Sequence, residues 1–187
     1  HLDFRRQRQM CIRDSSIIMA AHNEEVILGK KLDSIFASNY PEDKIELIIG
    51  TDCCNDSTDE IVSRYKAKYP NINHIVFKER SGKVRIVNQL VKTAKNEILV
   101  LTDANVLFSK DTLFELAKHF KNNKIGLVDS HMKNYGLSET GISFPEQSYI
   151  SLEVHLKDAE GRKFGSMMGP FGGCFAMRKN LYSEVPN

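Results

Sequence analysis

Short apolar runs alternate with segments of helical periodicity along most of this chain, and that alternation constrains its fold more than any other feature. The clearest run, Ile98–Leu101, consists of Ile, Leu and Val and is bounded by polar residues. Such a run is typical of a strand that is covered on both faces of a parallel sheet. Strands are predicted in the same way at Ser16–Ala21, Lys44–Thr51, Asn73–Phe77, Ile125–Ser130 and Cys174–Met177.

Amphipathic segments separate these runs. Asn23 is the expected N-cap of the first helix, because its short side chain can accept a backbone N–H. Past Asn134 the pattern loosens. Helices are predicted after Asn23, after an Asp56 or Ser57 cap, at Val84–Ala94, at Asp111–Phe120 and at Glu146–Leu156, with a glycine-rich stretch over Gly161–Gly173. The alternation predicts an α/β fold, a mostly parallel sheet with helices on both faces.

Composition narrows the class of protein. A chain of 187 residues suits one domain with a sizeable core, and 26 basic against 24 acidic side chains give no field that would favour a nucleic acid partner. No apolar run approaches the roughly 20 residues that span a bilayer, and no signal peptide is visible. The four cysteines fit no zinc pattern, which indicates thiols in a reducing, cytoplasmic compartment.

The first 14 residues alternate charge and polarity without a clear period. They contain four arginines, which could form a basic arm for phosphate or membrane lipid. We interpret residues 1–14 instead as a disordered or foreign tail, and residues 15–187 as the domain.

Polar clusters stand where three of the predicted strands end: Asn23-Glu24, then Asp52 with Asp56, then Asp103 with Asn105. The carboxyl ends of parallel strands share one edge, where ligands of open α/β sheets bind. Asp103 and Asn105 could together ligate Mg²⁺ or Mn²⁺, which prefer oxygen and commonly arrive on substrate phosphates. A solvated turn is the alternative for a single Asp-x-Asn. Carboxylates crowded on one edge predict a cationic or donor-rich ligand, such as a nucleoside with a metal–diphosphate.

Five blocks follow one another in a familiar order: IIMAAHNEE, LIIGTDCCNDSTDEI, SGKVRIVNQL, EILVLTDAN and GPFGGCFAMRK. Together they resemble the signature of glycosyltransferase family 2, the inverting enzymes with a GT-A nucleotide-diphospho-sugar fold. The resemblance runs from about Ser16 to Lys179. Each block is weak by itself, and their order makes the match specific.

The resemblance implies roles for individual residues. Asp52 would accept hydrogen bonds from the nucleobase, and Asp103 with Asn105 would occupy the family's Asp-x-Asp site for metal and diphosphate. The Asn removes one negative charge from that site, although its carbonyl can still ligate Mg²⁺. Lys83 would lie near the nucleotide, and the alternative interpretation is that it is a solvated side chain at a helix start. The matched substrate-binding positions are Ala21, Glu24, Asp52, Lys83 and Asp103. Gly172-Gly173 and Arg178 resemble the strand that borders the acceptor side.

No catalytic base can be named. Relatives carry an acidic residue after the glycine-rich strand, and here that position falls beyond Asn187, so we expect a fragment that binds donor and transfers little sugar. Glu153 and Glu160 fit surface helix positions better than the role of a base. The implied reaction uses a divalent metal to transfer sugar from a nucleotide-diphospho-sugar, first of all a UDP-sugar, to a glycan or lipid-linked acceptor, as in cell wall or polysaccharide synthesis. Membrane association of the longer protein stays open.

Two other functions remain. One is a nucleotide-sugar-binding module without catalysis, which the Asp-x-Asn variant favours slightly. The other is a nucleotidyltransferase, which should carry a glycine-rich, basic phosphate loop after its first strand. The sequence has the acidic stretch AAHNEE at that place, so this function ranks third.

Overall fold

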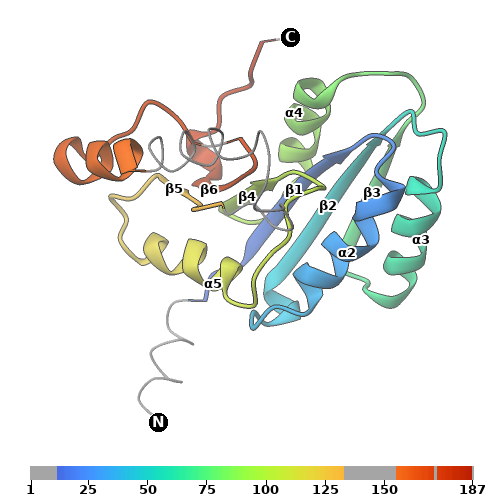
Figure 1. Ribbon diagram of the computed structural model, residues 1–187, viewed down its shortest axis with the longest axis horizontal. Coiled ribbons are helices and arrows are strands. Elements are labelled where there is room, and N and C mark those ends of the chain that lie inside the picture. The colour runs from blue at the N-terminus through green and yellow to red at the C-terminus, as the bar shows by residue number, and fades with distance from the viewer. Residues whose placement is uncertain (1–11, 133–154, 171, 187) are drawn as a thin grey trace, which may run out of the picture.

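The structure is a computed structural model that describes residues 12–132, 155–170 and 172–186. Its centre is a single sheet of six strands in the order β3-β2-β1-β4-β6-β5 (Figure 1). The strands are β1 (Ser15–Ala21), β2 (Ile45–Asp52), β3 (Ile72–Phe77), β4 (Ile98–Thr102), β5 (Leu127–Asp129) and β6 (Cys174–Arg178).

The first four strands run in the same direction. β1 pairs in parallel with both β2 and β4, and β2 pairs in parallel with β3, whereas β6 is antiparallel to β4 and β5. The mostly parallel sheet predicted from the sequence is therefore confirmed. Its consequence is that the loops after β1, β2 and β4 leave from one edge of the sheet.

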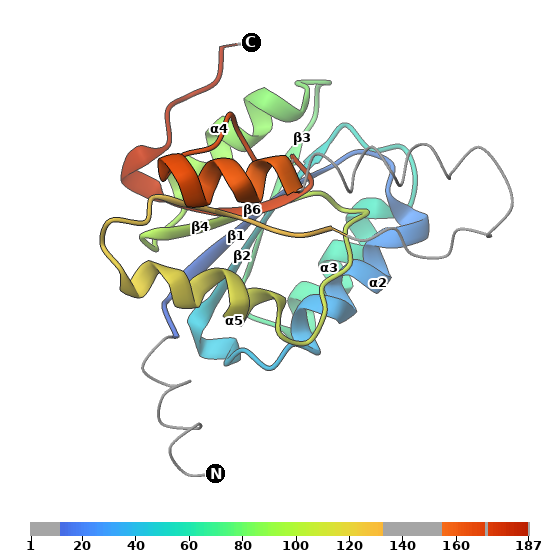
Figure 2. The same cartoon turned by 60° about the vertical axis from the view of Figure 1, so that its left-hand side comes forward.

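Helices cover both faces of the sheet, as predicted. α4 lies on one face, and α2, α3 and α5 lie on the other (Figures 1 and 2). None of the helices in the described residues is long and apolar enough to cross a membrane. The helices are α2 (Glu25–Phe36), α3 (Thr58–Lys68), α4 (Lys83–Thr93) and α5 (Thr112–Ala117), with 3-10 turns at Glu42–Lys44, Lys118–Lys121 and Lys179–Leu181. Residues 155–164 are also helical.

Alternating side chains of the central strands build two cores, because successive residues of a strand point to opposite faces. Ile17 of β1 packs with α2, α3 and α5, and its neighbour Ile18 packs with α4. Gly50 of β2 lets α4 approach closely: a Cβ at this position would lie 2.5 Å from Cγ2 of Ile86. The sheet is thus held from both sides, and its edge loops start from rigid positions.

Several sequence-based expectations need correction. Asn23 is not the N-cap of α2. Glu24 holds that position without a side-chain cap, since the Asn23 side chain accepts the N–H of Asn55 at 3.0 Å instead. The predicted helix to Phe120 ends as an α-helix at Ala117 and continues as a 3-10 turn. Residues 155–164 are helical through Gly161, where a glycine-rich stretch was expected.

Other expectations concern residues that are only partly described. Residues 1–11 of the expected tail and most of the helix expected at Glu146–Leu156 lie outside the described residues. Arg13, just before β1, donates its N–H to the Tyr40 hydroxyl at 2.8 Å. The cysteines Cys53, Cys54 and Cys174 are free thiols, as predicted, and Cys11 is outside the described part of the chain.

Candidate functional site

The loops after β1 and β2 are joined by reciprocal hydrogen bonds. The Asp56 carboxylate accepts the backbone N–H of Thr58 at 3.0 Å and that of Glu25 at 3.1 Å, so it serves the first turns of α3 and α2 together. The Glu25 carboxylate accepts the N–H of Ser57 at 3.0 Å. Burial raises the pKa of Asp56, but its hydrogen bonds outweigh burial and hold the pKa below the ordinary value. The acidic side chains here complete helix N-termini.

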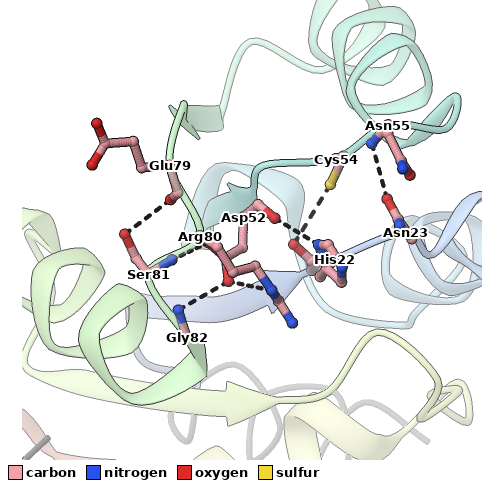
Figure 3. A network of polar contacts seen from close by, with 10 residues as sticks. His22, Asn23, Asp52, Cys54, Asn55, Glu79, Arg80, Ser81 and Gly82 are labelled. Carbon is pink, nitrogen blue, oxygen red and sulfur yellow. Dashed lines mark hydrogen bonds and ion pairs between the residues drawn. The ribbon is translucent and has the colours of Figure 1, made fainter.

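Further contacts join the same two loops (Figure 3). The Thr58 hydroxyl accepts the N–H of Glu24 at 2.8 Å, and the ring Nδ1 of His22 lies 2.6 Å from the carbonyl oxygen of Asp52. Ala21, at the end of β1, is buried, and its carbonyl oxygen is 3.8 Å from the Cys54 sulfur. Ala21 can therefore offer a ligand only backbone and a small apolar surface.

Asp52 is the last residue of β2, and its carboxylate points into the loop that precedes α4 (Figure 3). It accepts the N–H of Ser81 at 2.7 Å and that of Gly82 at 3.0 Å, and it pairs with the Arg80 guanidinium. Burial raises the pKa of Asp52, but these donors together lower it below the ordinary value. Gly82 has a φ of 81°, a conformation that favours glycine. The Asp52 carboxylate is therefore ionised and already supplied with donors from the protein.

Asp103 lies in the turn after β4 and faces the start of α4. Its Oδ1 accepts a hydrogen bond from the Lys83 ammonium at 2.5 Å, and its backbone N–H donates to the carbonyl oxygen of Gly173 at 3.0 Å. Asn105 is exposed, and Ala104 between them is buried. The side chains of Asp103 and Asn105 thus lie at the surface of the turn, on either side of the buried Ala104.

Glu24 connects the first cluster with the third. Its pKa is raised, first by burial and then by the negative charges of Asp103 and Asp56. The structure therefore brings Glu24 and Asp103 within electrostatic range, with Lys83 bound to Asp103. Asp52 ends the neighbouring strand at the same edge but turns toward residues 80–82. This edge carries more negative than positive charge near Glu24, and such a field attracts a cation.

The residues at this edge fit a hard divalent cation whose other ligands are mostly water and substrate oxygens. The described residues contain no group of three or more His, Cys, Asp or Glu side chains that could hold a metal. Asp103 and Asn105 offer a carboxylate and an amide oxygen, both hard donors. A Mg²⁺ or Mn²⁺ ion bound here would depend on phosphate oxygens and water for its other ligands.

Arg80 is a residue that sequence reasoning missed. Its guanidinium is 57% exposed and reaches the carboxylate of Asp52, whose side chain is only 3% exposed. It lies in a charged run directly before the Ser-Gly-Lys block, so its sequence neighbours gave no sign that it would pair with an acid at the end of β2.

Lys31 was missed as well, and its position did carry a signal. Its side chain is fully buried in α2, and Nζ donates to Oγ1 of Thr102 at 2.9 Å and to the carbonyl oxygen of Val106 at 2.5 Å. A lysine in the middle of an apolar helical stripe is unusual and could have drawn attention to it. The stripe consists of Leu28, Lys31, Leu32 and Ile35.

The two ends of β6 lie at different edges of the sheet. Gly173 is at the candidate site, whereas Arg178 pairs with Ile98 at the start of β4. The Arg178 guanidinium donates to the carbonyl oxygens of residues 120, 122 and 125 and is engaged within the fold. Two hollows of about 530 and 320 Å³ lie at that opposite edge as well, and both are lined by Asp14 and Lys95. The smaller hollow is also lined by Arg178, and neither is lined by a residue predicted to bind the donor or the metal.

The fold and the candidate site define a class: an α/β domain whose parallel strands end in acidic side chains at one edge. Within that class, the chain belongs to glycosyl transferase family 2, whose model matches residues 16–185. The fold is of the GT-A type, as predicted.

Similar proteins place this domain within longer chains. The probable glycosyltransferase YdaM of Bacillus subtilis is 27% identical over 175 residues, which cover 91% of this chain and 41% of YdaM. Among solved structures, the mannosyltransferase PcManGT of Pyrobaculum calidifontis, in complex with GDP-Man and Mn²⁺, matches with a TM-score of 0.74 and 24% identity, over 96% of this chain and 52% of that one. TarS of S. aureus, residues 1–349 with UDP-GlcNAc, has a TM-score of 0.61 and 25% identity, over 69% of this chain and 36% of that 1–349 chain.

Proposed function

We propose that this domain binds the nucleotide-diphospho-sugar donor of a glycosyltransferase and takes part in transferring the sugar to an acceptor hydroxyl with inversion. The observation that carries this proposal is the meeting of Glu24 and Asp103 with the end of β2 at one edge of a family 2 domain. The nucleotide sugars bound to PcManGT and TarS support a donor of this kind. Because the chain spans only about two fifths of YdaM, the activity of the whole protein is part of the proposal.

Each predicted substrate-binding residue has a role in this proposal. Asp52 would accept an N–H of the nucleobase in place of the exposed Arg80 side chain, and Ala21 and Glu24 would border base and ribose. Asp103 and Asn105 would hold Mg²⁺ or Mn²⁺ against the diphosphate. When bound, the metal would neutralise the charge that develops on the leaving diphosphate.

Lys83 would add a second positive charge beside that diphosphate. Its ammonium is 59% exposed and already lies at the Asp103 carboxylate, so only a small side-chain movement would bring it to a phosphate oxygen.

The transfer itself needs a base that none of these residues supplies. The acceptor hydroxyl oxygen bonds to the anomeric carbon, the bond from that carbon to the diphosphate oxygen breaks, and the electron pair leaves with the diphosphate. The hydroxyl proton passes to a general base. We propose a glycan or lipid-linked acceptor, in cell wall or polysaccharide synthesis. The free thiols of Cys53, Cys54 and Cys174 favour a cytoplasmic site, at the membrane surface if the longer protein is attached there.

Calorimetric titration with UDP and Mn²⁺ tests the donor site. Asp103→Ala removes one of two protein oxygens from the metal, and we expect the Kd of UDP–Mn²⁺ to rise about tenfold or more, equivalent to roughly 1.4 kcal/mol. Asp43→Ala is the matched control, since Asp43 is an exposed acid at the opposite edge. Unchanged binding by Asp103→Ala would refute the metal assignment. Binding of GDP in place of UDP would correct the donor, and binding of neither nucleotide would overturn the proposal.

A nucleotide-sugar-binding module without catalysis is the second candidate, and the neutral Asn105 at the metal site favours it. Incubation of the longer protein with a UDP-sugar, Mn²⁺ and glycan or lipid acceptors separates the two candidates. Release of UDP indicates an enzyme, whereas tight binding with no UDP release over hours indicates a module. Family membership favours either of these over nucleotidyl transfer.

A further inference from the structure

The loop that carries Asp103 and Asn105 is joined at both ends by one buried side chain. Lys31 belongs to α2, and its ammonium donates to the Thr102 hydroxyl at 2.9 Å and to the Val106 carbonyl oxygen at 2.5 Å. Thr102 directly precedes Asp103, and Val106 directly follows Asn105. The ammonium therefore bridges the two residues that flank the segment from Asp103 to Asn105.

Packing alone does not account for a lysine at this position. Its side chain is fully buried, and its ammonium lies 3.6 Å from the ring centroid of Phe108. An ammonium loses its hydration when buried, and neutral acceptors and an aromatic face replace that hydration only in part. Methionine has a similar volume and would fill the space beside Phe108 without this cost.

Two opposing effects act on the charge of the Lys31 amine. Burial lowers the pKa of Lys31 to about 7, while the nearby Cys174 and Asp103 raise it. Asp103 is thus close enough to interact electrostatically with an ammonium that it does not contact through a hydrogen bond. Lys31 is buried, whereas Asp103 is partly exposed.

From these contacts we propose that Lys31 is a positioning residue of the donor site, which holds residues 102–106 so that Asp103 and Asn105 present their oxygens to a metal–diphosphate. This role rests on the proposed function. Lys31 itself touches no substrate, because its side chain is enclosed. The other contacts that hold the loop are the hydrogen bonds from Asp103 N–H to Gly173, from Val106 N–H to Asp103 and from Lys83 to the Asp103 carboxylate, together with the burial of Ala104.

The test compares Lys31→Met with Lys30→Met. Lys30 is the neighbouring lysine on α2 and is exposed, so its substitution controls for the loss of one charge from the helix. In Lys31→Met we expect amide hydrogen exchange at residues 103–106 to accelerate about tenfold or more, because both hydrogen bonds from Lys31, to Thr102 and to Val106, are lost. The thermal midpoint should stay equal or rise, because the buried charge is gone.

Nucleotide binding supplies the second measurement. For each protein, the Kd of UDP is determined with Mn²⁺ and with EDTA, and the ratio of the two is compared. In Lys31→Met we expect the factor by which Mn²⁺ strengthens UDP binding to fall about tenfold, while the Kd of UDP in EDTA stays unchanged. A merely structural role would weaken binding under both conditions and lower the thermal midpoint.

The two measurements separate this inference from the proposed function. Unchanged exchange at residues 103–106 in Lys31→Met overturns the positioning role, whatever the nucleotide results. Accelerated exchange with a full Mn²⁺ enhancement also overturns it. If exchange accelerates in Lys31→Met but Mn²⁺ does not enhance UDP binding even in the wild type, the contact between Lys31 and the loop is supported and the metal assignment is refuted. Thr102→Val removes one acceptor from the other side, and its effect on exchange should not add to that of Lys31→Met.

Discussion

Replacing Asp52 with Asn should destabilise the fold strongly at neutral pH and hardly at acid pH. Two backbone N–H groups donate to the Asp52 carboxylate, and hydrogen bonds to a charged group contribute roughly 1.5–3 kcal/mol each. The exposed Arg80 adds little, roughly 0.5 kcal/mol. An Asn amide keeps one oxygen acceptor but turns its NH₂ group toward the other donors. We therefore expect a loss of about 2–3 kcal/mol in the free energy of unfolding at pH 7.

The pH dependence follows from the direction of the pKa shift. The hydrogen bonds and Arg80 outweigh burial and lower the pKa of Asp52 in the folded state. A carboxyl whose folded pKa is depressed contributes stability above its unfolded pKa of about 3.9, and this contribution is lost as the pH falls through the folded value. The difference between wild type and Asp52→Asn should therefore shrink below pH 4.

Urea unfolding followed by far-UV circular dichroism at pH 7 and pH 3 measures both quantities. Asp14→Asn is the control, because Asp14 is 58% exposed and its ion pair with Lys44 should contribute less than about 1 kcal/mol. A loss below about 0.5 kcal/mol at pH 7 would refute the hydrogen-bond accounting. An equally large loss at pH 3 would refute the assignment of an ionised Asp52.

Three further predictions concern other parts of the structure. Burial depresses the pKa of Lys31 to about 7, so between pH 7 and about 10 the unfolded chain binds a proton that the folded chain lacks. Urea titrations should therefore show that the wild type gains stability over this pH range relative to Lys31→Met. If the stability of both proteins changed equally with pH, that result would contradict the burial of this amine. Gly50→Ala should cost about 1–3 kcal/mol in urea unfolding, because its Cβ would overlap Ile86, and a neutral result would mean that α4 can shift. Lys83→Met should tighten Mn²⁺ binding about fivefold in paramagnetic titrations without nucleotide. The reason is that the exposed ion pair between Lys83 and Asp103, which contributes about 1 kcal/mol, no longer competes with the metal for the carboxylate. Weaker Mn²⁺ binding would refute that competition.

The architecture was predictable because burial leaves a simple pattern in the sequence. A strand covered on both faces is mostly apolar, and each of the runs ending at Ala21, Thr51 and Leu101 is a buried strand in the structure. The polar residues that follow could be assigned to one edge because parallel strands end together. The conformations of irregular connections are harder to predict, because they depend on hydrogen bonds to loops that are distant in sequence. The hydrogen bond between Asn23 and Asn55 is an example.

The site was predictable only in outline. Glu24 and Asp103 could be placed near each other from topology, but the contacts that orient a carboxylate come from residues distant in sequence. Arg80 lies 28 positions from Asp52, and Lys31 lies 71 positions from Thr102. Neither pairing has a local signature. For Lys31 the apolar stripe marks burial but does not identify the partner of the ammonium.

The reciprocal contacts of Asp56 and Glu25 have a consequence for how such a domain can change its ligand. Each side chain completes the backbone of the other's loop, so neither loop can be exchanged, shortened or diversified by itself without leaving open N–H groups in its neighbour. Variation that alters recognition at this edge must occur in both loops together.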